Sequence, residues 1–547
     1  MNFLRNPDKL IYILLIVCAA FYVTGIWYGL PYFFIGDEPS LIGGALKMIQ
    51  LKNPIPALDA QSFKMLYYPP LIPYIFNLFF VPILFVYYLT GHFGNLINFQ
   101  DYLVLSPSIL IIIARIISAL FGVALVFLTY KISKSIFKNS WAAFYGALLL
   151  AFGYYQNQLS HFARHWIFTA FFAYLILYFA VKITQENKTK WYIWAALFTG
   201  LSFGTSYVGV IFAIFVLTAH FWRGFKLTKD IILYFVVSAA VSLLFSFLYP
   251  QVLLGYFSGS GGREAGTSLV GFLNSVYYFG KVLVEMELPL VVFSLIGLIH
   301  LGRKREQRYF LYPLLFFIFF YPALLYFIFH NEPRYIFILI PALAIVGGMA
   351  INFIIEKLNN LQVNYGRIAC FLVILLPFII GARYNFLLTR KDTRILAKEW
   401  ILKNIPDKFN VLVNFSQLSL PRTKESILDQ KVLKEDSLRQ SESVLLRQDI
   451  LERPQYFVIN MRFIENDNEA LYKLKSWHTF DYLILERQIN SSLTETEKNL
   501  TQGLSKLKVF NQGDNISSED FTGNFVGNLL TLFKIKNFGP EVDIYKL

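Results

Sequence analysis

Apolar stretches separated by short charged loops fill the first 388 residues of the chain. The first stretch, Leu10–Leu30, carries no charge and can span a bilayer, which takes about 20 residues. It has no small-residue cleavage site, so we interpret it as a retained helix rather than a signal peptide. The pattern predicts a polytopic α-helical membrane protein. The further apolar stretches lie at 70–90, 106–130, 141–160, 165–182, 191–206, 207–222, 231–250, 288–301, 309–329, 335–355 and 366–388.

The last 159 residues have a different pattern, in which short apolar runs alternate with polar, helix-compatible stretches such as 465–476 and 493–506. This alternation predicts a small soluble α/β domain at 389–547, next to a membrane domain at 1–388. The polar stretch 416–450 is expected to be partly flexible. No glycine-rich phosphate-binding motif is present, so nothing indicates a nucleotide site. The predicted strands are Val411–Phe415, Tyr456–Ile459, Tyr482–Leu485 and Val542–Tyr545.

Composition excludes a wholly soluble or disordered chain, because 56% of the residues are hydrophobic and only 15% are charged, against about 25% charged in soluble proteins. The two cysteines, Cys18 and Cys370, lie in apolar runs and provide neither a disulfide framework nor a cysteine zinc site. The net charge is +14, of which +13 falls on residues 1–388. Basic residues between apolar runs are typical of cytoplasmic loops, so we expect no nucleic-acid partner.

The stretch at 70–90 decides the predicted topology. If it crosses the membrane, the basic loops that follow lie outside. If it stays on the outer side, as an interfacial or re-entrant element beginning at Pro69-Pro70, 17 basic residues fall in short inner loops and seven in longer outer segments. The positive-inside rule favours the second arrangement. It predicts about eleven crossings of the plasma membrane, a cytoplasmic N-terminus, an outer first loop at 31–105 and an extracytoplasmic C-terminal domain.

Two adjacent acids, Asp37 and Glu38, follow the first crossing directly. Carboxylates are expensive near lipid unless they have a use. A partly desolvated carboxylate can act as a general base with a raised pKa, or ligate a divalent cation. On residue types alone, an interfacial pair that faces water is the alternative.

Other polar residues are expected on the same outer side. Arg334 opens a late crossing, where it could bind phosphate as a forked donor or reach the lipid head groups. Arg263 lies in a glycine-rich loop that could close over a substrate or be a plain connector. His161, Arg164 and His165 have spacings of three and four, so they could share a helical face. No third metal ligand is identifiable, which favours a structural role over metal binding.

The order of the motifs along the whole chain resembles the GT-C glycosyltransferases, in the branch of protein O-mannosyltransferases and the lipid A aminoarabinose transferase. Each motif is weak alone, but their shared order is specific. The motifs are Asp37-Glu38, the aromatic–proline element Tyr67–Tyr74, Ala163-Arg164, Arg334-Tyr335 with the downstream Pro341, Asp392–Pro406 after the last crossing, and Gly539–Tyr545 at the end.

The resemblance implies an inverting glycosyltransferase. Such enzymes take a sugar from a polyprenyl-phosphate carrier at the outer face and pass it to a hydroxyl of a protein, lipid or glycan acceptor. By the resemblance, Asp37 is the general base or orients the acceptor, Glu38 stands beside it, and Arg334 contacts the phosphate of the carrier. The implied partners are the lipid-linked donor, membrane lipid and an acceptor protein or glycolipid. The residues expected to contact substrate are Tyr68, Arg164, His165, Tyr207, Arg263, Glu332, Arg334 and Tyr335.

Three features of the sequence depart from these relatives. Trp166 stands where many relatives carry an acid, Tyr67-Tyr68 stand where the aminoarabinose branch has Glu-Lys, and Tyr207 stands where many relatives have a lysine. A second acidic ligand is therefore missing. We predict no defined metal site, with a divalent cation as the one candidate cofactor.

Two other functions remain open from the sequence. Many crossings and interrupted apolar segments suit a transporter or flippase of lipid-linked or amphipathic solutes. Against it stand the lack of an internal repeat and the expectation that no acid lies within a crossing. The third hypothesis is a non-catalytic subunit whose outer domain binds a partner.

Overall fold

The structure is a computed structural model, and its described residues fall into two compact units. Unit 1 is built from segments 1–26, 37–83 and 110–385, and unit 2 from 27–36, 84–109 and 386–547. The predicted boundary at residue 388 stays a prediction. The described residues are 6–91, 93–224, 226–251, 268–303, 314–315, 317–318, 320–322, 333–360, 365–414, 418–433, 440–447, 454–461, 479–487, 493–513 and 529–547.

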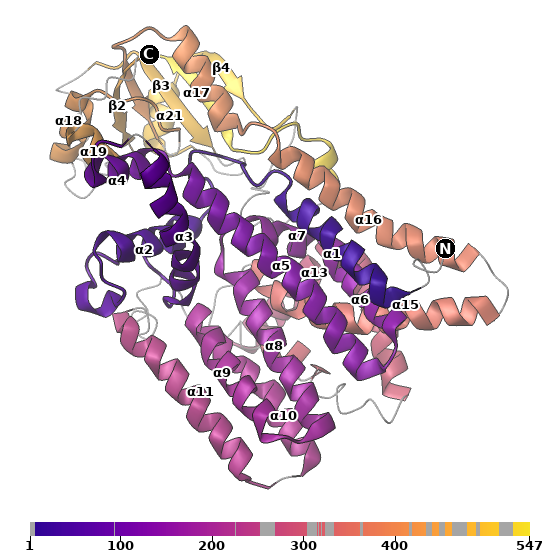
Figure 1. The fold of residues 1–547 in the computed structure, drawn as a ribbon. Helices are drawn as coiled ribbons and strands as arrows, with labels where there is room; N and C mark the ends of the chain where they lie inside the picture. Colours follow the sequence, from indigo (N-terminus) through magenta and orange to yellow (C-terminus); the bar gives the residue numbers. More distant parts are fainter. Residues whose placement is uncertain are drawn as a thin grey trace. The chain divides into compact units, whose positions relative to one another are not determined.

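Helices make up the described part of unit 1 (Figure 1). Among the described residues, six apolar helices are long enough to span a bilayer, and they begin at residues 71, 108, 165, 229, 269 and 334. This finding confirms the predicted polytopic helical class, whereas the number of crossings and the orientation of the termini stay predictions. The elements are α1 (Pro7–Val23), α2 (Glu38–Gln50), η2 (Pro56–Asp59), α3 (Leu71–Thr90), α5 (Ser108–Phe137), α6 (Ser140–Phe152), α7 (Tyr154–His161), α8 (His165–Glu186), α9 (Thr189–Thr205), η3 (Tyr207–Phe212), α10 (Ala213–Arg223), α11 (Lys229–Leu248), α13 (Leu269–Arg303), η5 (Pro333–Leu339), α15 (Ile340–Asn360) and α16 (Tyr365–Leu388).

The predicted first crossing is too long. Helix α1 ends at Val23, and the chain then turns through Gly25 and Gly29, whose φ angles are 84° and 78°. Glycine adopts this left-handed region at little cost, so the turn ends the helix although the sequence stays apolar. The stretch at 141–160 is likewise broken, at Gly153, into α6 and α7.

Helix α13 corrects a second expectation. The predicted crossing at 288–301 is part of a 35-residue helix that kinks at Glu287, two residues before Pro289. Glu287 is buried and accepts the backbone N–H of Tyr155 at 2.9 Å, at the start of α7. An acid therefore does lie within a long apolar helix, where it caps the N-terminus of a neighbouring one.

Small residues let α6 and α15 approach closely. A Cβ atom added at Gly348 would lie 2.2 Å from the backbone nitrogen of Gly146. One added at Gly146 would lie 2.8 Å from the carbonyl oxygen of Ala344. Backbone contact of this kind is a common way for membrane helices to associate, because lipid supplies no hydrophobic force between them.

Unit 2 contains a five-stranded mixed sheet in the order β2-β1-β3-β5-β4. Strand β1 is parallel to β2 and β3, while β5 is antiparallel to β3 and β4. Apolar side chains from both faces are buried, with Val411 and Ile484 in one cluster and Leu412 and Leu483 in the other. The elements are β1 (Asn410–Val413), β2 (Phe457–Asn460), β3 (Tyr482–Arg487), β4 (Lys506–Phe510), β5 (Glu541–Lys546), α4 (Leu96–Leu105), α17 (Thr393–Asn404), α18 (Lys424–Leu433), α19 (Gln440–Arg447), α21 (Glu495–Thr501) and η8 (Leu529–Phe533).

The predicted α/β class is confirmed, and all four predicted strands occur within a residue or two of their expected positions. Strand β4 was not predicted, and of the helix-compatible stretch 493–506 only α21 is helical. The stretch expected to be partly flexible, 416–450, contains α18 and α19. The helical stretch expected at 465–476 lies outside the described residues.

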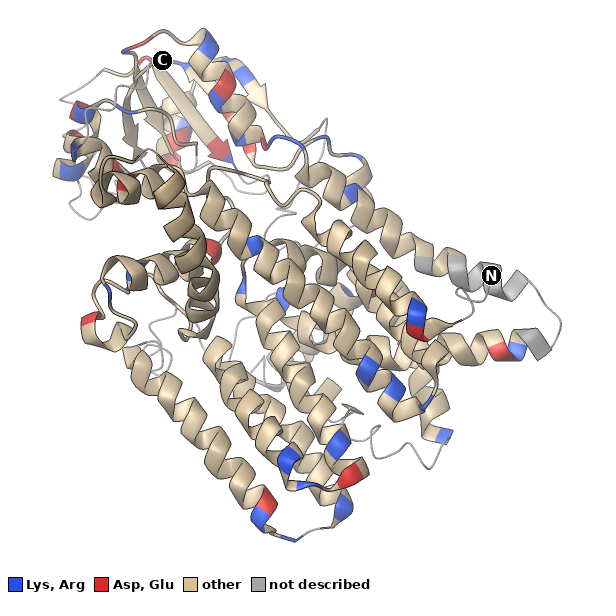
Figure 2. Ribbon diagram, in the orientation of Figure 1, with Lys and Arg blue, Asp and Glu red and all other residues tan. Residues whose placement is uncertain are grey.

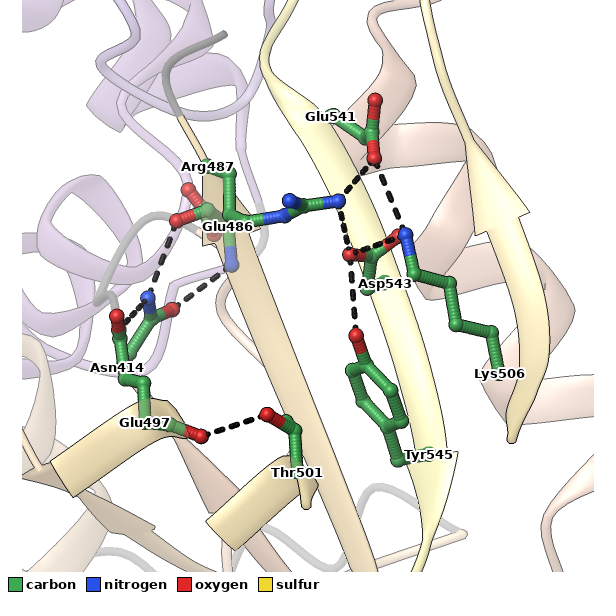
Figure 3. Close-up of polar contacts among 9 residues, drawn as sticks. All are labelled: Asn414, Glu486, Arg487, Glu497, Thr501, Lys506, Glu541, Asp543 and Tyr545. Atoms are coloured by element: carbon green, nitrogen blue, oxygen red, sulfur yellow. Dashed lines mark hydrogen bonds and ion pairs between the residues drawn. The ribbon is translucent and has the colours of Figure 1, made fainter. Parts of the chain in front are cut away.

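A buried carboxylate fixes the antiparallel half of this sheet (Figure 3). The side chain of Asp543 on β5 is fully buried and pairs with Arg487 on β3 at 2.5 Å and with Lys506 on β4 at 2.9 Å. Both cations also contact Glu541. Because removing one partner would leave a buried charge uncompensated, this network favours one pairing of the three strands.

Candidate active site

Three charged side chains from separate segments of unit 1 meet at the start of α2. Asp37 is the N-cap residue of α2, and its side chain is 18% exposed. Its Oδ2 atom accepts from Arg164 Nε at 3.3 Å and lies 3.2 Å from Arg164 Nη2. Arg334, at the start of η5, brings its Nη2 atom to 4.0 Å from the same oxygen. The expected proximity of the outer acid and the late arginine is therefore present.

The two arginines govern the charge of Asp37. Burial by itself raises the pKa of a carboxyl group, but the positive charges of Arg164 and Arg334 outweigh burial and lower the pKa of Asp37 below its usual value. His165 and the Tyr68 hydroxyl act in the same direction with smaller effect. Of the options that the sequence left open for Asp37, a raised pKa is therefore not found, and the lowered pKa favours the carboxylate form.

Aromatic rings lie next to this charged cluster. The ring centroids of Tyr68 and His165 are 4.1 Å apart, those of His165 and Trp166 4.3 Å, and those of Trp166 and Tyr335 4.7 Å. The Arg334 guanidinium lies 5.7 Å from the centre of the Tyr335 ring. Four aromatic residues from three segments thus form a continuous series of tilted ring contacts, and it includes three of the residues that we expected to contact substrate.

Glu38 has a different environment from its neighbour. It is fully buried, and both of its oxygens accept from Arg115 of α5, at 2.8 Å from Nε and 2.8 Å from Nη2. Sequence reasoning missed Arg115. The signal that could have found it is a single charge inside the apolar stretch 106–130, since charges in such runs are rare and usually paired.

This ion pair connects the backbone segments that carry the cluster. Glu38 Oε1 also accepts the N–H of Ala163 at 2.9 Å, and Arg115 Nη1 donates to the carbonyl of Ile26 at 2.7 Å. Asp37 and Arg164 are the immediate chain neighbours of Glu38 and Ala163. The Glu38–Arg115 pair is therefore placed to fix the positions of Asp37 and Arg164 relative to each other. This suits a positioning role better than direct catalysis.

The remaining predicted residues lie elsewhere. The expected helical face shared by His161, Arg164 and His165 is wrong, because α7 ends at His161 and α8 begins at His165. His161 instead contacts the carbonyl oxygens of Asn157 and Thr24 at 2.7 and 3.0 Å. Tyr207, in η3, packs its ring on Phe203. The predicted Arg263 and Glu332 lie outside the described residues.

Metal ligation has little support from residue types here. Within the described ranges, no three His, Cys, Asp or Glu side chains gather as a ligand set. Both oxygens of Glu38 accept from Arg115. A divalent cation stays the one candidate cofactor, as the sequence left it.

Comparison with known proteins finds a matching family model and similar solved structures. Residues 103–250 match the family model described as dolichyl-phosphate-mannose-protein mannosyltransferase. ArnT from Cupriavidus metallidurans in the apo state has a similar structure, with a TM-score of 0.50 at 11% identity over 98% of each chain. The chain has the GT-C fold. No curated protein sequence matches it.

Other solved GT-C structures give similar values. ArnT from C. metallidurans bound to undecaprenyl phosphate aligns with a TM-score of 0.46 at 12% identity, over 98% of this chain and 97% of that one. The Archaeoglobus fulgidus oligosaccharyltransferase in complex with zinc and sulfate aligns with a TM-score of 0.49 at 14% identity, over 86% of this chain and 68% of that one. The predicted resemblance to GT-C proteins is confirmed.

Proposed function

We propose that this chain is a glycosyltransferase that moves a sugar from a polyprenyl-phosphate carrier to an acceptor hydroxyl, with inversion at the anomeric carbon. The family match and the GT-C fold support a glycosyltransferase rather than the alternative of a transporter. The observation that carries the proposal is the approach of Arg164 and Arg334 to one oxygen of Asp37. Such a cluster offers cations for a leaving phosphate and a carboxylate for the attacking hydroxyl.

The arginines supply the phosphate-binding half of the reaction. A guanidinium presents a fork of N–H donors that matches a phosphate group, and it keeps its charge at all physiological pH values. As the glycosidic bond to phosphate breaks, negative charge accumulates on the phosphate, and fixed cations stabilise it most at that moment. ArnT from C. metallidurans has been solved with undecaprenyl phosphate, so this lipid is a suitable probe for the proposed donor class.

Asp37 supplies the other half. With both arginines directed at it, Asp37 is a weak base, because their charges favour its deprotonated form. A donor phosphate bound by the same arginines offsets part of their charge, which raises the proton affinity of Asp37. Donor binding would then prepare the base that accepts the proton of the incoming hydroxyl, as general-base catalysis at an inverting centre requires.

The finer assignments belong to the same proposal. We place the reaction at the extracytoplasmic face of the plasma membrane, with the N-terminus in the cytoplasm and the domain at 389–547 outside it. The transferred group is a hexose or pentose, and the acceptor is a protein or a glycolipid. Tyr68, His165 and Tyr335 are proposed to contact the sugar, since aromatic rings present apolar faces to the C–H groups of a pyranose.

Comparative mass spectrometry of cell-surface glycolipids and glycoproteins tests this function. Cells that express the wild-type chain should carry one sugar linkage that is absent from cells without the gene, and from cells that express Asp37→Ala at equal protein levels. The matched control is Asp59→Ala, since Asp59 lies in η2 and contacts neither arginine of the cluster in the described contacts. An identical glycan profile in all four strains would reject the function.

A further inference from the structure

A second polar feature of unit 1 lies between the C-terminal ends of α5 and α8. Figure 2 shows Lys and Arg residues near these helix ends. A shallow, open depression of about 370 Å³ lies there, and its rim includes the exposed side chains of Lys131 and Lys138. The residues that line it are Lys131, Lys134, Ser135 and Lys138 from the α5 side and Tyr178 and Lys182 from α8.

The charge of this cavity, which we call the lysine pocket, is only partly balanced. Lys134 pairs with Asp8, and Lys182 pairs with Glu186 at 3.2 Å. Lys131 and Lys138 have no carboxylate partner within the described part of the chain; the ammonium of Lys131 lies over the ring of Phe127. Two of the four lysines that line the lysine pocket thus have no carboxylate partner among the described residues, so its lining is positively charged, which favours an anion.

The walls of the lysine pocket are held together by contacts between α5 and α8. Ser135 donates to the Gln185 side chain at 3.0 Å, and Gln185 donates back to the Ser135 carbonyl at 2.8 Å. The Lys182 ammonium lies 5.9 Å from the centre of the Tyr178 ring, one turn earlier on α8. The lysines therefore converge from two joined helices and are not scattered along one loop.

The position of the lysine pocket relates it to a lipid. Helix α8 begins at His165 in the candidate active site and reaches Lys182 after 17 residues, a rise of about 26 Å at 1.5 Å per residue. The hydrocarbon core of a bilayer is about 30 Å thick. In a bilayer that α8 spans, the pocket lies at the interface opposite the active site, where the phosphates of lipid head groups are found.

We propose that the lysine pocket binds a phosphate group, supplied by the head group of an anionic phospholipid in the leaflet opposite the active site. Basic pockets between transmembrane helices bind anionic head groups in this way, each lysine adding about 1 kcal/mol near a charged surface. The positive-inside rule explains why lysines occur at this interface, but not why four of them line one cavity.

Binding of dihexanoylphosphatidylglycerol to the full-length purified protein in neutral detergent tests the proposal. The double variant Lys131→Gln/Lys138→Gln removes the two uncompensated charges and should weaken binding about 25-fold, at about fivefold per lysine. The matched control, Lys226→Gln/Lys229→Gln, removes the same charge at residues outside the pocket and should bind within twofold of wild type. Lys131→Arg/Lys138→Arg should retain binding, which separates loss of charge from loss of folding.

Two competitors identify the source of the phosphate. If dihexanoylphosphatidylcholine fails to compete and inorganic phosphate competes only at far higher concentration, the ligand is the anionic lipid head group. If inorganic phosphate competes as well as the lipid, the pocket binds phosphate itself and the assignment to a lipid is overturned. Equal losses of affinity in the pocket variant and the control variant would overturn the site altogether. The measurement involves no sugar transfer, so it is independent of the proposed catalytic function.

Discussion

Substitutions at the Glu38–Arg115 pair can distinguish its contribution to folding stability from its role in positioning the charged cluster. Both side chains are fully buried, and two 2.8 Å hydrogen bonds join them. Replacing either alone, by Glu38→Leu or Arg115→Met, leaves the other charge buried without its counterion and should cost about 3–5 kcal/mol of unfolding free energy. Replacing both removes the two charges together, and the remaining cost is that of two unmade backbone hydrogen bonds, about 1–3 kcal/mol each.

The double-mutant cycle should therefore be strongly non-additive, with a coupling energy of about 3 kcal/mol or more. Denaturant titration in mixed micelles measures the unfolding free energies. The exposed pair Lys391–Glu399, joined at 2.6 Å, is the control, and its coupling should stay below about 1 kcal/mol. Simple additivity at Glu38 and Arg115 would contradict the assignment of a buried ion pair.

The same double variant tests positioning. It keeps Asp37 and Arg164 but loses the bonds to Ala163 and Ile26 that hold their backbone segments. We expect it to be about as stable as either single variant, yet to bind undecaprenyl phosphate at least tenfold more weakly than the wild type. A stable double variant with wild-type affinity for this lipid would refute the positioning role.

Three further outcomes are expected. Asp37→Asn should reduce sugar transfer about 10²–10⁴-fold while undecaprenyl phosphate binds at least as tightly, because a competing carboxylate is gone; retained transfer would exclude it as the base. Burial raises the pKa of Asp37 and Arg164 lowers it, and the net effect is a lowered pKa. The stability that ionised Asp37 contributes is therefore fully present above the ordinary aspartate pKa, and it is lost as the pH falls through the lowered pKa. Arg164→Gln should therefore move the acid limb of both stability and transfer to higher pH, and an unmoved limb would contradict this coupling. Gly348→Ala, whose Cβ would press on Gly146, should lower the unfolding free energy by about 1–3 kcal/mol, whereas Gly43→Ala in open space should not.

The sequence pattern was informative wherever burial alone decides structure. Long apolar stretches correctly predicted helices, and short apolar runs correctly predicted the buried strands β1, β2, β3 and β5. Strand β4 was not recognised because it lies at the edge of the sheet, where Lys506, Lys508 and their neighbours are exposed or only partly buried. Two helix ends were not predicted for another reason: the turn at Gly25 and the break at Gly153 depend on backbone conformation, which the apolar residues before them do not indicate.

The site was predictable where polar residues stand out against apolar surroundings. Asp37 and Arg334 were expected to share one outer site, and they do approach each other. The division of labour between Asp37 and Glu38 was not predictable, because it depends on Arg115, which is 77 positions from Glu38 in the chain. Two adjacent acids have equal chemistry in the sequence, and only the fold joins Glu38 to Arg115 and places Asp37 beside Arg164 and Arg334.

The most direct test of the central claim is the fate of a lipid-linked sugar given to the purified protein. Wild-type protein, incubated with polyprenyl-phosphate sugar donors and candidate acceptors, should release polyprenyl phosphate and form a glycoside whose anomeric configuration, followed by NMR, is opposite to that of the donor. Asp37→Asn should release neither product at a comparable rate. A glycoside of retained configuration, or equal release by the variant, would contradict the proposal that Asp37 and the two arginines together carry out an inverting transfer.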